Sequence, residues 1–267
     1  MAEFRGRVLA IGGSDPGGGA GIQADIKTVT ALGGYAAAVI TAITVQDTLD
    51  VSGVQLISAE MIEAQGRAVL DDIGTDAIKT GMLGTIAAVE AVARLIDRAL
   101  GVPTVVDPVM AAKGGRDLLD PTAVDTVRAL LIPGCALLTP NAPEAQALTG
   151  LTIAVTDDLR RAGEALLGMG ARAVLMKGGH VAGETVVDLL MTPNGETTFS
   201  GPRIDSRHTH GTGCTLASAC AHGLAQGLGL QAAVARAWGY TAQAIRRAPG
   251  FGVGHGPIDH GWTFRER

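Results

Sequence analysis

The sequence predicts an α/β fold in which a mostly parallel central sheet carries helices on both faces. Short β-branched runs alternate with helical periods along the chain, which is typical of this class. The runs are apolar at nearly every position, as expected for parallel strands covered on both sides. Residues 185–191 and 196–199 differ, because they flank the turn Pro193-Asn194-Gly195 and predict a short antiparallel hairpin at one edge.

The individual elements follow from these periods. Strands are predicted at 8–12, 36–45, 76–80, 104–107, 136–138 and 173–177. Helices are predicted at 20–33, 59–72, 85–100, 121–132, 142–149, 156–169, 212–228 and 231–247. Asp120 and Pro121 form a plausible N-cap and first helical residue, and Thr156 is expected to cap the helix that Asp157 and Asp158 begin.

Composition indicates one folded domain. Of the 267 residues, 47% are hydrophobic and 18% are charged, so the chain can bury a sizeable core and is not of the disordered class. No linker, low-complexity tract or internal repeat divides it, and a single domain over 1–267 is expected. The net charge of -5 and the lack of a long Lys/Arg run argue against nucleic acid as a partner.

Cysteine usage and the apolar runs point to a reducing compartment. Cys135, Cys214 and Cys220 are odd in number and have no CxxC spacing, so a disulfide framework or zinc site is not expected. No signal-peptide pattern opens the chain, and runs such as 35–45 are too short to span a bilayer. A cytoplasmic protein without a membrane partner is expected.

The glycine-rich segment at 12–21 follows the first predicted strand directly. It lacks the Gly-Lys-Ser/Thr ending of a P-loop, and Ile22 stands where the dinucleotide fingerprint needs its third glycine. A dinucleotide-dependent oxidoreductase is therefore disfavoured. Two interpretations remain open for this segment: a flexible turn into a helix, or a loop whose backbone closes on a small ligand.

Two further glycine-rich segments lie near the end of the chain. The first, His210-Gly211-Thr212-Gly213-Cys214, opens a predicted helix, where unpaired amides and the helix dipole favour an anion. The second, at 250–257, is a loop for which ligand contact and a purely structural role are equally open. The sequence therefore predicts an anion hole at 211–213.

The order and coverage of several motifs resemble one family. The motifs are AIGGSDPGGGAGIQAD (10–25), TAITVQDT (41–48), KTGML (79–83), VVDPVM (105–110), LLTPNAPEA (137–145), MKGGH (176–180), THGTGCT (209–215) and GHGPIDH (254–260). Together they resemble the ribokinase-like superfamily, and within it the hydroxymethylpyrimidine kinases and some pyridoxal kinases, in which Cys replaces the usual aspartate base. The resemblance implies a three-layer ribokinase-like fold.

The resemblance assigns catalysis to Cys214 and its neighbours. It implies that Cys214 takes the proton of a substrate hydroxymethyl group, while the amides of Gly211, Thr212 and Gly213 stabilise the transferring phosphoryl group. A helix N-terminus is expected to lower the pKa of this thiol toward neutrality. The alternative is a buried structural cysteine, the interpretation favoured for Cys220.

A second group of residues is expected at the phosphates. Lys177 ends an apolar strand, and the resemblance gives it, with Asn141 and Thr209, contact with ATP phosphate; a solvated strand end is the alternative for Lys177. Asp107 and Glu144 are the candidates for Mg²⁺, which prefers hard oxygen ligands. Asn141 and Glu144 also fit a capping box, and the residues alone do not decide between the two interpretations.

A third group is expected around the substrate ring. Gln46 follows an apolar strand, and its amide offers a donor and an acceptor that match an aminopyrimidine edge. The resemblance implies that Gln46 reads this edge, with Gly13, Ala20, Val109 and Met82 in the same pocket. An ordinary polar residue at a strand end is the alternative for Gln46.

These residues predict a kinase that uses ATP and Mg²⁺. The hypothesis is phosphorylation of 4-amino-5-hydroxymethyl-2-methylpyrimidine and then of its monophosphate. The alternatives are a pyridoxal kinase of the same fold and a non-catalytic metabolite sensor. His208 and His210 are interpreted as loop histidines rather than metal ligands. The resemblance suggests a homodimer, to which the hairpin at 185–199 could contribute.

Overall fold

A computed structural model describes residues 6–112 and 114–265, so both ends of the predicted 1–267 domain lie outside the described residues. The described residues form one nine-stranded sheet in the order β3-β2-β1-β4-β5-β6-β7-β8-β9. The strands are β1 (Arg7–Ser14), β2 (Tyr35–Gln46), β3 (Val51–Leu56), β4 (Ala77–Thr80), β5 (Thr104–Val106), β6 (Leu137–Leu138), β7 (Val174–Met176), β8 (Thr185–Thr192) and β9 (Gly195–Pro202). Strands β2, β1, β4, β5, β6 and β7 are parallel, and antiparallel strands flank them at both edges.

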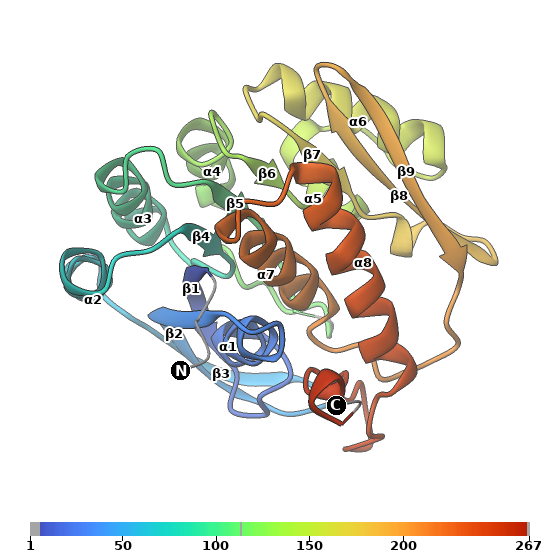
Figure 1. The fold of residues 1–267 in the computed structure, drawn as a ribbon, viewed down its shortest axis with the longest axis horizontal. Helices are drawn as coiled ribbons and strands as arrows, with labels where there is room; N and C mark the ends of the chain where they lie inside the picture. Colours follow the sequence, from blue (N-terminus) through green and yellow to red (C-terminus); the bar gives the residue numbers. More distant parts are fainter. Residues whose placement is uncertain (1–5, 113, 266–267) are drawn as a thin grey trace.

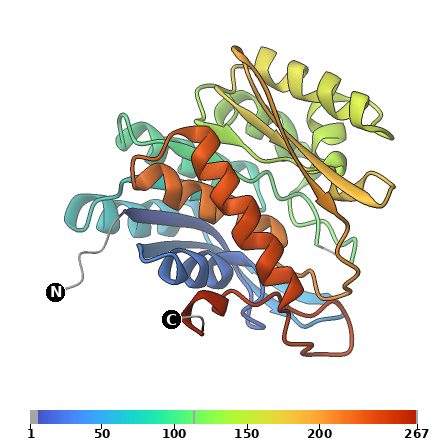
Figure 2. The same ribbon diagram turned by 45° about the vertical axis from the view of Figure 1, so that its right-hand side comes forward.

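Two helical layers cover the sheet, as Figure 1 and the rotated view in Figure 2 show. One face carries α2 (Ala59–Asp72), α3 (Ile86–Arg98), α4 (Val124–Leu130), α5 (Ala142–Thr149) and α6 (Thr156–Gly168). The other carries α1 (Gly21–Ala31), α7 (Thr212–Ala225) and α8 (Leu230–Arg246). The predicted mostly parallel sheet, helices on both faces and edge hairpin β8–β9 are confirmed.

Three local expectations were incomplete or wrong. Strand β3 was not predicted; it pairs antiparallel with β2 and closes the opposite edge of the sheet. The predicted helix at 121–132 is divided into a 3-10 turn, Pro121–Ala123, and α4, although Asp120 does cap it by accepting a hydrogen bond from the amide of Thr122. Val155, not Thr156, occupies the N-cap position of α6.

The topology fixes where a ligand can bind. Strand β1 lies between β2 and β4, so the order of the parallel strands reverses there, and a crevice opens beyond their carboxyl ends. Helix α7 packs against β1, β4 and β5, and Gly213 in its first turn lies beside Lys177 and Asp107, which directly follow β7 and β5. Among the helices of the described segments, none has the length and apolarity that a membrane crossing requires.

Candidate active site

A cavity of about 1180 Å³ lies at the carboxyl ends of the parallel strands. Every residue that the sequence placed in the site lines this cavity. They are Gly13, Ala20, Gln46, Met82, Asp107, Val109, Asn141, Glu144, Lys177, Thr209, Gly211, Thr212, Gly213 and Cys214. The structure therefore brings the three expected groups of residues together in one space, although they come from segments spread along the chain between residues 13 and 214.

The first and second glycine-rich segments touch at the start of α7. Gly211 is the N-cap and has a φ of +82°, and a Cβ added to it would overlap the carbonyl oxygen of Gly19. Only glycine combines this left-handed backbone with so close an approach. Residues 211–214 line the cavity at the positive end of the helix dipole, although the amide of Thr212 also makes a long contact of 3.4 Å with the carbonyl oxygen of Thr209. This geometry can bind the oxygens of a phosphate group.

Cys214 lies in the first turn of α7 and remains partly exposed to the cavity. Its surroundings raise the pKa of the thiol to about 11, mainly because burial disfavours the thiolate; Lys79 and the amide of Gly21 oppose this rise. The expected shift of this pKa toward neutrality is therefore wrong. The position at a helix N-terminus does not compensate for the loss of water and for the carboxylates of Asp25 and Asp107.

Lys177 connects the anion hole to two carboxylates. Its Nζ lies 3.0 Å from Asp107 Oδ1 and 3.7 Å from Glu144 Oε2. Burial alone would lower the pKa of Lys177, but the charges of Asp107 and Glu144 raise it above its ordinary value. A Cβ added to Gly213 would lie 3.3 Å from Lys177 Nζ, so the ammonium group sits against the first turn of α7. A permanent positive charge and a helix N-terminus thus face the same part of the cavity.

Asn141 and Glu144 form a capping box, which is one of the two interpretations that the sequence allowed for them. The Asn141 side chain accepts from the amide of Glu144 at 2.9 Å, and Glu144 Oε2 accepts from the amide of Asn141 at 2.8 Å. Burial raises the pKa of Glu144 to about 7, with Lys177 opposing the rise. The cap and the Lys177 contact both use Oε2.

The carboxylates of the cavity allow a test of the magnesium expectation. Within the described residues, no group of three or more His, Cys, Asp or Glu side chains could hold a metal ion. In the part of the chain that the structure describes, Asp107 and Glu144 nevertheless share one ion-pair partner, Lys177, so the donor set keeps an excess of negative charge when both are ionised. Such a site fits Mg²⁺ that takes most of its ligands from water and phosphate and few from the protein.

The residues expected at the substrate ring lie beside the start of α7: Gln46 Nε2 is 3.3 Å from His210 Nε2, and a Cβ added to Gly211 would lie 3.2 Å from Ala20 Cα. Gln46 ends β2, and Ala20 is the N-cap of α1. A Cβ added to Gly13 would lie 2.9 Å from Met82 Sδ, so Gly13 leaves room for this side chain. Val109 is half-buried on the loop after β5. A flat ring could be held between these apolar groups with the Gln46 amide at its edge.

Sequence reasoning assigned no role to two acid–base pairs of this cavity. Lys79 and Asp25 form a fully buried ion pair, and Asp25 also accepts from Ser218 Oγ at 2.6 Å. The second pair is Asp15 with His210, whose Nε2 lies 2.9 Å from Asp15 Oδ2. Lys79 in an otherwise apolar strand was a usable signal, because a buried ammonium group needs an acidic partner.

Comparison with known proteins places the chain in a family. The sequence model of the phosphomethylpyrimidine kinase family matches residues 15–259. The hydroxymethylpyrimidine/phosphomethylpyrimidine kinase of Streptomyces coelicolor is 48% identical over 259 residues, which cover 97% of this chain and 96% of the relative.

Solved structures agree with this match. The phosphomethylpyrimidine kinase of Clostridium difficile 630 superposes with a TM-score of 0.80 at 40% identity, over 91% of this chain and 100% of that one. The pyridoxal kinase of Bacillus subtilis, solved as an ADP complex, superposes with a TM-score of 0.91 at 33% identity, over 98% and 100% of the two chains. The ribokinase-like fold that the motifs implied is confirmed by these neighbours. With a family model matching most of its length and a relative almost half identical, the chain belongs to the phosphomethylpyrimidine kinase family.

Proposed function

We propose that the protein is an ATP-dependent kinase that phosphorylates 4-amino-5-hydroxymethyl-2-methylpyrimidine and then its monophosphate, in thiamine biosynthesis. The observation that supports this most directly is the arrangement of one cavity. Lys177 and the first turn of α7 supply positive charge, and Gln46 supplies an amide next to His210, the residue that precedes the N-cap of α7. The relatives named above carry this activity in their names.

ATP would bind through groups that are already in place. Lys177 presents a fixed ammonium group, and the amides of Gly211, Thr212 and Gly213 would donate hydrogen bonds to the transferring phosphoryl group. Asn141 and Thr209 line the same region. The Bacillus subtilis neighbour was solved with ADP, which supports a nucleotide as a ligand of this fold.

The two transfers differ in their proton requirement. In the first, the hydroxymethyl oxygen forms a bond to the γ-phosphorus of ATP, the bond to ADP breaks, and the alcohol proton goes to Cys214 as thiolate. In the second, the acceptor is a phosphate oxygen that is already largely ionised, so no proton needs to move. Lys79 and the Gly21 amide, which oppose the raised thiol pKa, would stabilise the thiolate during the first step.

Asp107 and Glu144 are the residues proposed to face Mg²⁺, through water or directly. The ion would supply charge neutralisation between the ATP phosphates. The protein would contribute few ligands, in agreement with the small donor set of the cavity. We further propose that the whole chain acts as a single kinase domain.

Pyridoxal kinase is the second candidate, because a pyridoxal kinase superposes on nearly the whole chain. Gln46 favours the pyrimidine, since its amide pairs with an aminopyrimidine edge that pyridoxal lacks. Replacing Gln46 by Met is expected to weaken pyrimidine use by about 1–3 kcal/mol, as a buried hydrogen bond is lost. An unchanged kcat/KM would show that Gln46 does not select the substrate.

The deciding experiment is a phosphoryl-transfer assay with ATP and Mg²⁺ that offers hydroxymethylpyrimidine and pyridoxal side by side. Formation of the monophosphate and then the diphosphate from the pyrimidine is the expected result. Turnover of pyridoxal alone would move the protein to vitamin B6 salvage. Ligand binding with no turnover of either substrate would favour a metabolite sensor.

We also propose a homodimer in the cytoplasm. Exposed apolar side chains gather around β2 and β3, with Ile43, Val45, Leu49 and Leu56 between 44% and 62% exposed. This patch supports a contact at the β3 edge rather than through the β8–β9 hairpin. Sedimentation velocity on the wild type and on Val45→Asp tests it, and a monomeric wild type would rule the dimer out.

The three free cysteines agree with a reducing compartment, which cell fractionation would check.

A further inference from the structure

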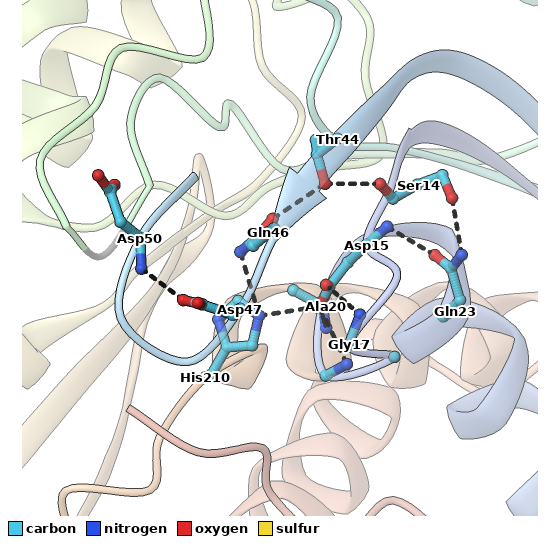
Figure 3. A network of polar contacts seen from close by, with 12 residues as sticks. Ser14, Asp15, Gly17, Ala20, Gln23, Thr44, Gln46, Asp47, Asp50 and His210 are labelled. Atoms are coloured by element: carbon cyan, nitrogen blue, oxygen red, sulfur yellow. Dashed lines mark hydrogen bonds and ion pairs between the residues drawn. The ribbon is translucent and has the colours of Figure 1, made fainter. Parts of the chain in front are cut away.

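The Asp15 carboxylate is the centre of a buried polar network beside Gln46 in the wall of the cavity (Figure 3). It accepts from the amides of Gly17, Gly19 and Ala20 at 2.8, 3.0 and 2.8 Å. His210 Nε2 lies 2.9 Å from its Oδ2. Burial would raise the pKa of Asp15, but the hydrogen bond from His210 and the amides lower it below the ordinary value. An ionised carboxylate only accepts, so Nε2 of His210 must carry a hydrogen.

Gln46 lies against this network and against a hydroxyl group. With its amide placed as in Figure 3, Nε2 lies 3.3 Å from His210 Nε2, and Oε1 lies 3.3 Å from Thr44 Oγ1. Thr44 Oγ1 is also 2.9 Å from the carbonyl oxygen of Ser14, which can only accept. The single hydroxyl hydrogen of Thr44 can serve only one of these two accepting oxygens; given to the nearer one, that of Ser14, it leaves a lone pair of Thr44 facing Gln46. In this placement the NH₂ group of Gln46 faces the N–H of His210, and the oxygen of Gln46 faces a lone pair of Thr44.

Rotation of the amide by 180° resolves both conflicts at once. The nitrogen and oxygen of a carboxamide are almost equal in size, so the surrounding donors and acceptors decide which position each takes. We infer that His210 is a positioning residue that fixes the Gln46 amide, with the oxygen accepting from His210 Nε2–H and the nitrogen donating to Thr44. Asp15 and Gln46 then share the one hydrogen of His210.

The fixed amide has a defined capacity left for a ligand. Two of its four hydrogen-bonding positions serve Thr44 and His210, which leaves one N–H donor and one oxygen lone pair. Because the nitrogen and oxygen cannot exchange, these free positions have a fixed order along the amide. The inference that follows rests on the proposed function: the edge being read belongs to a 4-aminopyrimidine, with a ring nitrogen that accepts and an amino group that donates.

The order of donor and acceptor makes His210 a specificity-determining residue. The 4-oxo analogue of the substrate presents the reverse pattern, a ring N–H beside a carbonyl oxygen. When His210 fixes its orientation, the Gln46 amide can donate to the ring nitrogen of the 4-amino edge and accept from the amino group. Against the 4-oxo edge, the same amide places its N–H opposite the ring N–H and its oxygen opposite the carbonyl oxygen. Without His210 the amide can turn, so it serves both edges and discrimination is lost. An unpaired buried polar group is what normally produces such discrimination.

The test compares kcat/KM for the 4-amino substrate with kcat/KM for its 4-oxo analogue. His210→Phe should lower this ratio at least about tenfold, mainly through the KM values of the two pyrimidines, and leave the KM for ATP unchanged. His210→Gln, whose amide can again donate to Asp15 and Gln46, should recover a large part of the ratio. His208→Phe is the matched control, because His208 does not line the cavity.

Each outcome bears on the inference. An unchanged ratio in a folded His210→Phe variant, or an equal loss for both pyrimidines, would overturn it, since the second result describes a purely structural role. If His210→Phe does not fold, Thr44→Val carries the test, because it removes the acceptor for the Gln46 nitrogen and should also lower the ratio. Absence of turnover in the wild type would overturn the proposed function and this inference with it, whereas the ratio in the variants tests the inference alone.

Discussion

Lys79 Nζ lies 2.9 and 3.0 Å from the two carboxylate oxygens of Asp25, and both side chains are completely buried beside the cavity. Ser218 adds a third hydrogen bond to Asp25. Burial would lower the pKa of Lys79, but Asp25 raises it above its ordinary value, so the lysine remains charged. The pair and its hydrogen bond from Ser218 add polar contacts to the apolar packing that joins β4, α1 and α7.

Lys79→Met should destabilise the protein strongly. The substitution leaves the Asp25 carboxylate buried without a cation, which costs about 3–5 kcal/mol. Urea unfolding measures this loss, and adding Asp25→Leu to Lys79→Met should restore a large part of it. The control is Arg98→Met, which breaks an exposed pair with Asp71 and should cost less than about 1 kcal/mol. A similar loss in both single variants would argue against this account.

Alkylation of Cys214 should be slow at neutral pH. Because the pKa of its thiol is raised to about 11, the reactive thiolate is a small fraction at pH 7 and grows about tenfold for each pH unit. The rate with iodoacetamide is therefore expected to rise from pH 7 to pH 10 without a plateau. Mass spectrometry assigns the site, and Cys214→Ala should remove it. A plateau below pH 8 would mean that the thiolate is already stabilised in the free protein.

Cys214→Ala should separate the two phosphoryl transfers. Loss of a general base slows the first transfer, to the alcohol, by about 10²–10⁴. The second transfer, to an ionised phosphate, should slow by less than about tenfold. Release of ADP with hydroxymethylpyrimidine or its monophosphate as acceptor measures each step. Equal losses in both would assign Cys214 an architectural role instead.

His260 should make stability depend on pH in the acidic range. Burial lowers the pKa of this imidazole to about 4, with Lys27 adding to the effect, so the folded protein holds it neutral. The unfolded chain binds a proton at about pH 6.5, and the free energy of unfolding therefore falls as pH drops from 6.5 to 4, by about 3 kcal/mol. Urea unfolding across this range should show a flatter profile for His260→Gln than for the wild type. His255→Gln, at an exposed position, should keep the wild-type slope.

Much of the fold could be predicted because its signals are local. The central strands are apolar on both faces, and helices α2 and α5 have the predicted bounds. Strand β3 was not predicted because VSGVQL mixes polar residues and Gly53 with few apolar ones, and an edge strand needs no fully apolar pattern. The Pro121 turn was merged with α4 because periodicity does not distinguish a 3-10 turn from the first turn of an α-helix.

Site residues that belong to a recognisable motif could be predicted from the sequence. Contacts between residues that lie far apart in the sequence could not. Gln46, Lys177 and Cys214 follow strands or open a helix, so their common location could be argued from topology. The pKa of Cys214 was expected to move the wrong way, because the burial that raises it comes from residues far away in the sequence. His210 was interpreted as a loop histidine because nothing near it in the sequence indicates Asp15 as its partner.

The contact between Asp15 and His210 joins positions 195 residues apart, and this separation has a consequence for synthesis on the ribosome. At about 5–20 residues per second, the loop around Asp15 is made roughly 10–40 s before His210. During that interval Gln46 has no partner that fixes its amide, and α7 has not yet brought its positive end to the cavity. The parallel strands can pair while the chain is still growing, but nascent chains should not retain the pyrimidine until translation has passed α7.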